Sequence, residues 1–203
     1  MRRTEYQSDD KAQWRQIVTE AAVGYLGMIT PDGWPRVVPM NFAAAVDRTI
    51  YFHGAAEGEK FTVLQESPKV TFSIDLAYSV IPSYWISKKN AGGATMYYKS
   101  ALVKGRCVIV EDIDEKVAAL KLLMEKYQND GGYQDITADS KTYRGLLKAT
   151  AIFRIDPEDI DIKINFRQKK SLDFHRKIIK NLTDRGTPLD LKTAEEIKKL
   201  IKI

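Results

Sequence analysis

Strand-like runs bounded by turn residues recur along residues 23–164, and in some of them hydrophobic and polar positions alternate, whereas residues 165–203 show helical spacing. These runs predict strands at 23–29, 35–42, 43–46, 49–53, 69–75, 97–111, 149–155 and 160–164, with clear period-two alternation at 69–75 and 97–111. Apolar positions three and four apart predict helices at 9–22, 58–66, 117–127 and 138–147. Short turns join the first two pairs of strands, and parallel strands cannot use such turns. The pattern therefore predicts a closed antiparallel β-barrel with helices packed at its ends.

Three features interrupt this pattern. Pro39 lies within the second strand and lacks an amide donor, which predicts an edge or bulged position for that strand. Residues 77–93 have no period, and we expect a long loop there, of the kind that is often functional or mobile. Cys107 lies in the middle of a strand, where a buried small hydrophobic role is expected.

The charge of the chain is concentrated at its C-terminal end. The formal net charge is +5, but residues 165–203 hold 11 Lys/Arg and 5 Asp/Glu, which leaves −1 for the rest. Two apolar stripes at helical spacing occur in the same segment. We therefore predict a barrel domain at 1–164 and a basic helical extension at 165–203, packed on the barrel.

Composition excludes several classes of protein. No apolar run approaches the ~20 residues of a membrane helix, and the first residues do not resemble a signal segment, so a cytoplasmic protein is expected. A single cysteine allows no intrachain disulfide. The two histidines, His53 and His175, have no companions at metal-ligand spacing, so no metal centre is predicted. No glycine-rich nucleotide loop and no nucleophile motif is present.

One segment nevertheless has the features of an anion site. Residues 51–60 lead from a strand end through a Gly/Ala loop into a helix start that carries Lys60. Free backbone amides, the helix dipole and a cation would converge there on a phosphate, and Arg36 on the neighbouring strand would add a bidentate contact. From the residues alone, the usual interpretation of an Arg and a Lys such as Arg36 and Lys60 is still a solvated surface charge.

The order and spacing of several motifs resemble the pyridoxamine 5′-phosphate oxidase-like FMN-binding split barrels, and most of all the branch of the 5-nitroimidazole resistance proteins. The matching segments include Gly27 to Pro35, Val38-Pro-Met-Asn-Phe42, Tyr51-Phe-His-Gly54 with Gly58 and Lys60, Lys69 to Phe72, and Lys99 to Gly105. The resemblance covers residues 1 to about 160. It implies a split β-barrel with FMN held in a groove between the two subunits of a homodimer.

The resemblance also implies roles for individual residues. Arg36 and Lys60 would hold the phosphate, and the strand through Val37, Val38, Pro39, Met40 and Asn41 would run beside the ring and ribityl chain. Phe52, His53 and Gly58 would border the pocket, and Tyr98 and Ser100 would reach the flavin from the same or the partner subunit. His53 would bond a ring carbonyl or pass a proton, with a merely structural histidine as the alternative. Glu59 departs from the family, in which a basic residue commonly precedes the matching lysine.

Two functions of different classes follow. The first is an FMN-dependent reductase of small aromatic compounds, nitro-bearing ones among the candidates, with electrons from a nicotinamide nucleotide or a protein donor. The second is a non-catalytic FMN-binding or regulatory protein whose basic tail contacts DNA. If the protein is a reductase, nucleic acid is not an expected partner. Another flavin, or haem on one of the two histidines, is left open as the cofactor. The chain lacks the C-terminal substrate-binding segment of a pyridoxamine phosphate oxidase proper.

Overall fold

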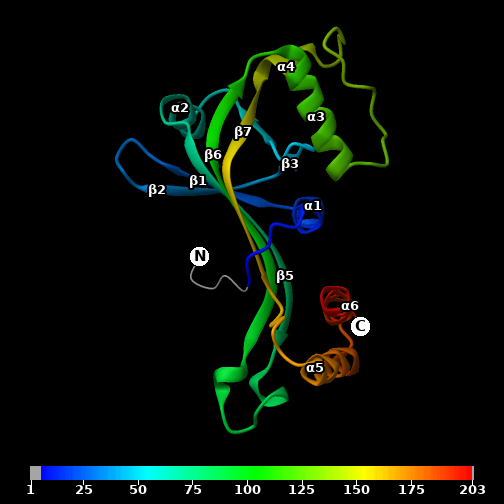
Figure 1. Ribbon diagram of the computed structural model, residues 1–203. Helices are drawn as coiled ribbons and strands as arrows, with labels where there is room; N and C mark the ends of the chain where they lie inside the picture. Colours follow the sequence, from blue (N-terminus) through cyan, green and yellow to red (C-terminus); the bar gives the residue numbers. More distant parts are fainter. Residues whose placement is uncertain (1–5, 203) are drawn as a thin grey trace. The chain divides into compact units, whose positions relative to one another are not determined.

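The computed structural model describes residues 6–202 and contains one seven-stranded sheet of order β2-β1-β5-β6-β7-β4-β3 (Figure 1). The strands are β1 Gly24–Ile29, β2 Pro35–Met40, β3 Ala43–Ala44, β4 Ile50–Ala55, β5 Lys69–Ile81, β6 Thr95–Val110 and β7 Thr150–Asn165. The α-helices are α1 Lys11–Glu20, α2 Glu59–Glu66, α3 Ile113–Tyr127, α4 Arg144–Ala149, α5 Leu172–Arg185 and α6 Pro188–Ile201. No helix among the described residues is both long and apolar enough to cross a membrane.

The chain forms two compact units. Unit 1 consists of the described residues up to Gln13, Asp75–Ser100 and the residues from Ile162 onwards. Unit 2 consists of Trp14–Ile74 and Ala101–Asp161, and it contains the β1–β2 hairpin, β3, β4 and helices α2 to α4. The predicted boundary at residue 164 between a barrel domain and a basic extension stays a prediction.

The β1–β2 hairpin of unit 2 forms where the sequence predicted it. Its strands are antiparallel, with Gly24 opposite Met40 and Ile29 opposite Pro35. Gly33 has a φ of 85°, a value that strongly favours glycine, and the Thr30 hydroxyl donates a hydrogen bond to Asp32 at 2.5 Å, which fixes the turn. β2 is an edge strand, as Pro39 requires.

A cluster of aromatic rings fills the interior of unit 2. Phe52 stacks on Phe153 with ring centroids 5.0 Å apart, and Phe42 packs edge-on against Phe72 at 5.2 Å. All four side chains have no exposed surface. Phe61 of α2 adds an edge contact to Phe153 at 6.2 Å. Burial of such rings is the main driving force for this part of the fold.

Helix α3 covers another part of unit 2. It packs against β3 and β4, and its buried residues Ala119, Leu120 and Leu123 join a hydrophobic cluster with Ile152 of β7. Asp112 caps the helix by accepting a hydrogen bond from the Glu115 amide at 2.8 Å. Of the positions that predicted this helix, Leu120 and Leu123 are buried, whereas Tyr127 at its end is 40% exposed.

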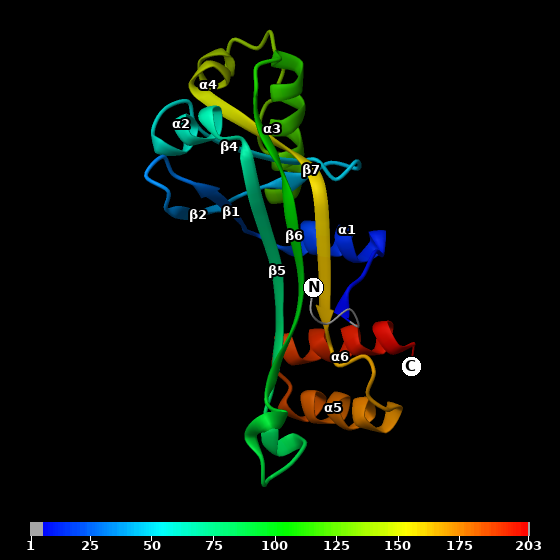
Figure 2. The same cartoon turned by 60° about the vertical axis from the view of Figure 1, so that its left-hand side comes forward.

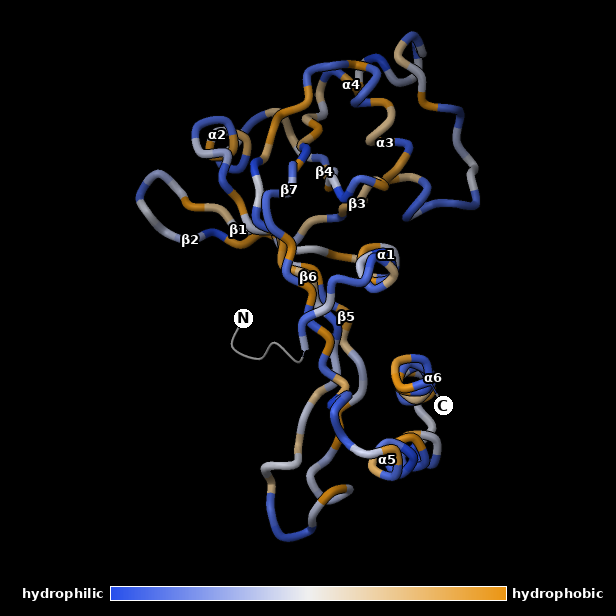
Figure 3. The backbone as a smooth tube through the Cα atoms, in the orientation of Figure 1, coloured by the Kyte–Doolittle hydropathy of each residue, from blue (hydrophilic) through white to orange (hydrophobic). Residues whose placement is uncertain are grey.

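In unit 1, α5 and α6 pack against each other, which Figure 2 shows as two neighbouring helices. Hydrophobic and hydrophilic residues alternate along both helices in Figure 3, as expected of amphipathic helices. Thr187 and Asp190 form a capping box at the start of α6. Thr193 of the same helix donates to the hydroxyl of Ser79 on β5 at 3.0 Å.

Several element boundaries differ from those predicted. β5 continues to Ile81, into the predicted loop. Tyr78, Ser79 and Ile81 are all buried, so the alternation on which a strand prediction depends is lost in this part of the strand. The two predicted strands at 149–155 and 160–164 are one strand, β7. Cys107 is buried as expected.

Helix limits differ too. α1 begins at Lys11 and ends at Glu20, inside the predicted range 9–22, and Asp10 accepts a hydrogen bond from the backbone amide of Ala12 at 2.7 Å at its start. The predicted helix at 138–147 is reduced to the short α4.

Candidate functional site

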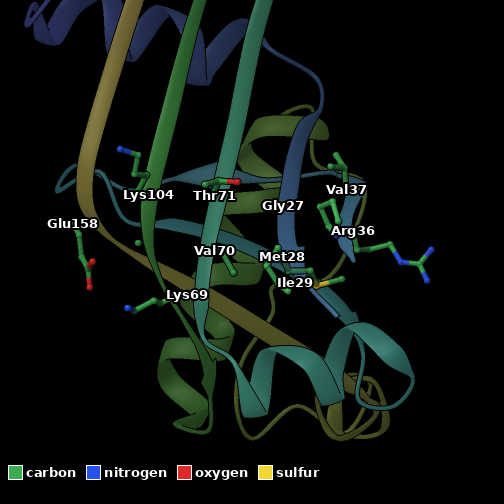
Figure 4. A pocket seen from close by; sticks show the side chains of 12 residues that line it. Gly27, Met28, Ile29, Arg36, Val37, Lys69, Val70, Thr71, Lys104 and Glu158 are labelled. Atoms are coloured by element: carbon green, nitrogen blue, oxygen red, sulfur yellow. The ribbon is translucent and has the colours of Figure 1, made fainter. Parts of the chain in front are cut away.

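A pocket of about 420 Å³ lies in unit 2 on the exposed face of the sheet, the face opposite to the buried side chains of Leu26 and Phe72. Figure 4 shows its lining, which comes from β1, β2, β5, β6 and β7. The residues used below are Gly27, Ile29, Val37, Lys69, Thr71 and Lys104. A concave, mainly apolar surface with a few polar groups is typical of small-molecule sites.

The floor of the pocket depends on Gly27. This residue pairs with Val37 on one side and with Thr71 on the other. A Cβ atom at position 27 would lie 2.5 Å from Oγ1 of Thr71, so glycine lets the floor stay flat. Val37 and Ile29 are 63% and 54% exposed, which is unusual for large apolar side chains on neighbouring strands. The floor can therefore accept a planar apolar group.

One side of the pocket is basic. Lys69 of β5 and Lys104 of β6 line it, and Nζ of Lys104 lies 3.2 Å from Oδ2 of Asp159 in an exposed ion pair. Glu158, the acidic lining residue, pairs with Arg106 at 2.9 Å. Exposed pairs of this kind are weak, so these lysines stay available to an anionic ligand.

Arg36 also lines the pocket, but its guanidinium belongs to a different surface. It stands opposite Met28 in the β1–β2 register, and Figure 4 shows its guanidinium pointing away from Thr71. Both carboxylate oxygens of Glu59, in the first turn of α2, lie 2.5–2.6 Å from Nη2 of Arg36. The hydrogen bond and charge of Glu59 raise the pKa of Arg36.

A second pocket, of about 310 Å³, surrounds this ion pair. Its lining consists of Thr30, Asp32, Trp34, Pro35, Arg36 and Glu59. Asp32 also raises the pKa of Arg36 through its charge, so the guanidinium lies among two carboxylates. The guanidinium of Arg36, which was predicted to contact the phosphate, is therefore already neutralised by carboxylates of the same chain.

Lys60 has the opposite surroundings. Its Nζ lies 3.8 Å from Sδ of Met40, 5.8 Å from the ring centroid of Phe52 and 5.4 Å from that of Phe153. No described carboxylate pairs with it, and burial lowers its pKa. Gly54 makes this position possible, because a Cβ atom there would overlap Nζ of Lys60. Lys60 is thus a partly desolvated cation that an anion would stabilise.

The other residues predicted around this strand fall into two groups. Val38 and Met40 share the face of Arg36, whereas Pro39 shares the exposed face with Val37. Asn41 donates a 3.4 Å hydrogen bond to the carbonyl oxygen of Ala22. Alternate residues of β2 therefore face two different surfaces, whereas the sequence prediction placed all of them beside one ligand.

Phe52 and His53 lie on opposite faces of β4. Phe52 is completely buried in the aromatic cluster, and His53 is exposed. Partial burial of the imidazole and the nearby charge of Lys60 lower the pKa of His53, which keeps the ring neutral at pH 7. Gly58 precedes α2 with a φ of 91°, which an L residue rarely adopts. Gly58 therefore lets the chain turn into α2 at its N-cap position.

Tyr98 and Ser100 lie on one face of β6, in unit 1. Nζ of Lys163 lies 5.3 Å from the ring centroid of Tyr98. Tyr97, the neighbour on the other face, is fully buried against Phe166 at 5.0 Å. Their predicted contact with a flavin stays a prediction.

Sequence reasoning missed Lys69, Thr71 and Lys104. Each lies on the polar face of a predicted strand, where a solvated residue is the ordinary interpretation. Gly27 carried the usable signal, because a glycine within a strand indicates close approach of another group. No group of three or more His, Cys, Asp or Glu side chains in residues 6–202 is placed to hold a metal ion.

Comparison with known proteins gives the family and the fold of the chain. The family model of pyridoxamine 5′-phosphate oxidase matches residues 10–164. A candidate 5-nitroimidazole antibiotic resistance protein from Bacteroides thetaiotaomicron is 25% identical, with a TM-score of 0.63, over 78% of this chain and 86% of that chain. No curated protein sequence matches the chain.

Two further solved structures share the fold. The flavocytochrome Anf3 from Azotobacter vinelandii is 16% identical with a TM-score of 0.66, over 85% of this chain and 75% of that one. An FAD and haem binding protein from Mycobacterium smegmatis is 17% identical with a TM-score of 0.66, over 90% and 80%. The predicted split barrel is thereby confirmed. The chain belongs to the pyridoxamine 5′-phosphate oxidase family.

Proposed function

We propose that the chain binds FMN in unit 2 and is a flavin-dependent reductase of small aromatic compounds. The observation that carries this proposal is the pocket floored by Gly27 and walled by exposed Val37 and Ile29, in a chain whose family is that of a phosphorylated-substrate oxidase. The FAD and haem binding protein and the flavocytochrome share its fold. Flavin binding is the property that best joins these facts.

The residues present fit such a cofactor. Gly27 leaves a flat apolar floor for a planar ring on the face of β2 that carries Val37. Lys60 lies beside Met40 on the other face of this edge strand and offers a cation without a carboxylate partner among the described residues, so the ribityl chain would cross the β2 edge to join ring and phosphate. When bound, FMN would supply hydride or single-electron transfer to an acceptor over its exposed face. The protein's part is to bind, to orient and to exclude water.

Individual residues would carry out these tasks. The exposed side chains of Val37 and Ile29 would contact the ring and exclude water from one of its faces. Lys60 would hold the phosphate. His53, kept neutral by its lowered pKa, would donate or accept a hydrogen bond at a ring carbonyl or pass a proton at its imidazole nitrogen. Tyr98 and Ser100 would contact the cofactor in the assembled protein.

A homodimer would complete the site. Val37, Ile29 and Tyr25 form an exposed apolar strip on β1 and β2, at 63%, 54% and 42% exposure, beside the pocket. Covering such a strip with a second copy would bury the cofactor and the apolar surface together. A cytoplasmic location and a nicotinamide nucleotide or protein electron donor complete the proposal.

The alternative function, DNA contact by a basic extension at 165–203, has less support. Of the cations that would form the DNA-binding face, Arg176 pairs with Asp173 at 3.3 Å and Lys180 pairs with Asp184. Arg185 is bound to the buried carboxylate of Asp190. Acids of the same helices thus already match these charges, which reduces the attraction for phosphates.

The experiment is an anaerobic assay of the FMN-loaded protein with NADH or NADPH and a nitroaromatic acceptor. We expect flavin bleaching by the donor and reoxidation by the acceptor. Val37→Glu should abolish both by weakening FMN binding, because a carboxylate would be buried against the ring. The matched control is Val108→Glu, at an exposed valine on β6 that does not line the pocket. Loaded protein that neither donor nor acceptor changes would refute the reductase.

A further inference from the structure

The two cations predicted to hold the phosphate differ in their surroundings. Nη2 of Arg36 lies 2.5–2.6 Å from both carboxylate oxygens of Glu59, and about half of each side chain is exposed. Asp32 contributes a second negative charge near the guanidinium. Lys60, the residue next to Glu59, instead contacts the sulfur of Met40 and two aromatic rings.

Because of these surroundings, an incoming anion gains less free energy at Arg36 than at Lys60. Phosphate at Arg36 must displace a carboxylate that already satisfies the guanidinium, and it meets repulsion from Glu59 and Asp32. Phosphate at Lys60 displaces no charged partner in the part of the chain that the structure describes, and it compensates an ammonium group that has lost part of its hydration. A phosphate contact at Lys60 therefore stabilises the complex more than one at Arg36.

We propose that Glu59 acts as an internal counter-anion of Arg36, so that Lys60 is the residue that distinguishes a phosphorylated from an unphosphorylated flavin in this chain. This inference rests on the proposed FMN binding. It makes Glu59 a specificity-determining residue, because its carboxylate weakens the selection for FMN over riboflavin.

The test compares dissociation constants for FMN and riboflavin, measured by quenching of flavin fluorescence. Their ratio isolates the phosphate, because the ring contacts are common to both ligands. Glu59→Gln removes the competing charge, and we expect the ratio to rise about five- to twentyfold in favour of FMN. The control is Glu66→Gln at the other end of α2, where the exposed carboxylate has no ion pair among the described residues.

A second set of variants locates the effect. Lys60→Met should bring the ratio close to one, whereas Arg36→Met should lower it less than threefold. In the double variant Arg36→Met/Glu59→Gln, the gain of Glu59→Gln should disappear, because the released guanidinium is absent. Unchanged riboflavin binding in every variant shows that the ring site is intact.

The outcomes separate this inference from the proposed function. FMN binding with an unchanged ratio in Glu59→Gln, or a ratio that collapses in Arg36→Met alone, overturns the role of Glu59 and leaves FMN binding in place. A gain that persists in the double variant also overturns it, because Glu59 would then act independently of Arg36. Failure of both the unaltered protein and Glu59→Gln to bind either flavin overturns the inference together with the proposed function.

Discussion

Nζ of Lys60 occupies the space that a Cβ atom at Gly54 would fill. The glycine of β4 and the lysine of α2 are therefore a spatial pair, and the ammonium lies within 6 Å of the Phe52 and Phe153 ring centroids because no side chain stands at position 54. This relationship explains how a cation that has no carboxylate partner among residues 6–202 is held at the end of an aromatic core.

The pair predicts the effect of Gly54→Ala. The new methyl group would displace Nζ of Lys60, which is the far end of a flexible side chain, so the fold should survive while the affinity for FMN falls about tenfold. Fluorescence titration measures the affinity and urea unfolding the stability. Gly145→Ala is the control, since a Cβ at this position of α4 meets nothing within 4 Å. Equal affinities in the two variants would contradict the proposed role of Lys60.

The buried ion pair between Lys99 and Glu196 should dominate the stability of α6 on β6. Neither side chain is more than 5% exposed, and Nζ of Lys99 also donates to Oε1 of Gln13 at 2.6 Å. Lys99→Met leaves a buried carboxylate, which should lower the free energy of unfolding by about 3–5 kcal/mol. Chemical denaturation measures the loss. Lys198→Met, in the exposed pair with Glu195, should change little, and a similar loss in both variants would show that burial is unimportant.

Acid should destabilise unit 1 through Asp190. The hydrogen bond from Arg185 holds the pKa of Asp190 well below its usual value, with further bonds from Ser79 and Thr187. Because the folded-state pKa is depressed, the stabilisation is complete above the usual carboxyl pKa and is lost as the pH falls from about 5 through the folded-state pKa. In Asp190→Asn the loss between pH 5 and 3 should be smaller. Asp173→Asn, at an exposed carboxylate of the same unit, is the control and should lose as much stability between pH 5 and 3 as the unaltered protein.

Cys107 should be unreactive in the folded protein. Burial, assisted by the charge of Asp156, raises the pKa of its thiol to about 12, so almost no thiolate is present at pH 8. A disulfide exchange reagent at that pH should modify the thiol at the rate of unfolding. Reaction within seconds under native conditions would mean that the thiol is accessible.

The sequence predicted the parts of the fold whose two strand faces differ in polarity. The β1–β2 hairpin was predicted because two strand-like runs flank the turn signal Pro31-Asp32-Gly33. Residues 78–81 were not, because Ser79 is buried and bonded to Thr193 and Asp190, so a polar residue occupies a core position. Long-range pairs of this kind leave no local signal.

The candidate site shows the same division. Resemblance and strand pattern together located β2, Lys60 and His53, but they did not predict that Arg36 would be paired with Glu59. That pairing depends on the path of the chain between β2 and α2, and the partners are separated by 23 residues. Lys69 and Lys104 were missed for the same reason, since each is an ordinary surface lysine until the pocket is known.

The absorbance spectrum of the purified protein during titration with FMN tests FMN binding most directly. We predict a yellow protein that saturates at one FMN per chain, with a shifted flavin band and quenched flavin fluorescence. Val37→Glu should lower this stoichiometry at a fixed FMN concentration, whereas Val108→Glu should not. A colourless protein whose spectrum equals the sum of free FMN and apoprotein at every point of the titration would contradict the account.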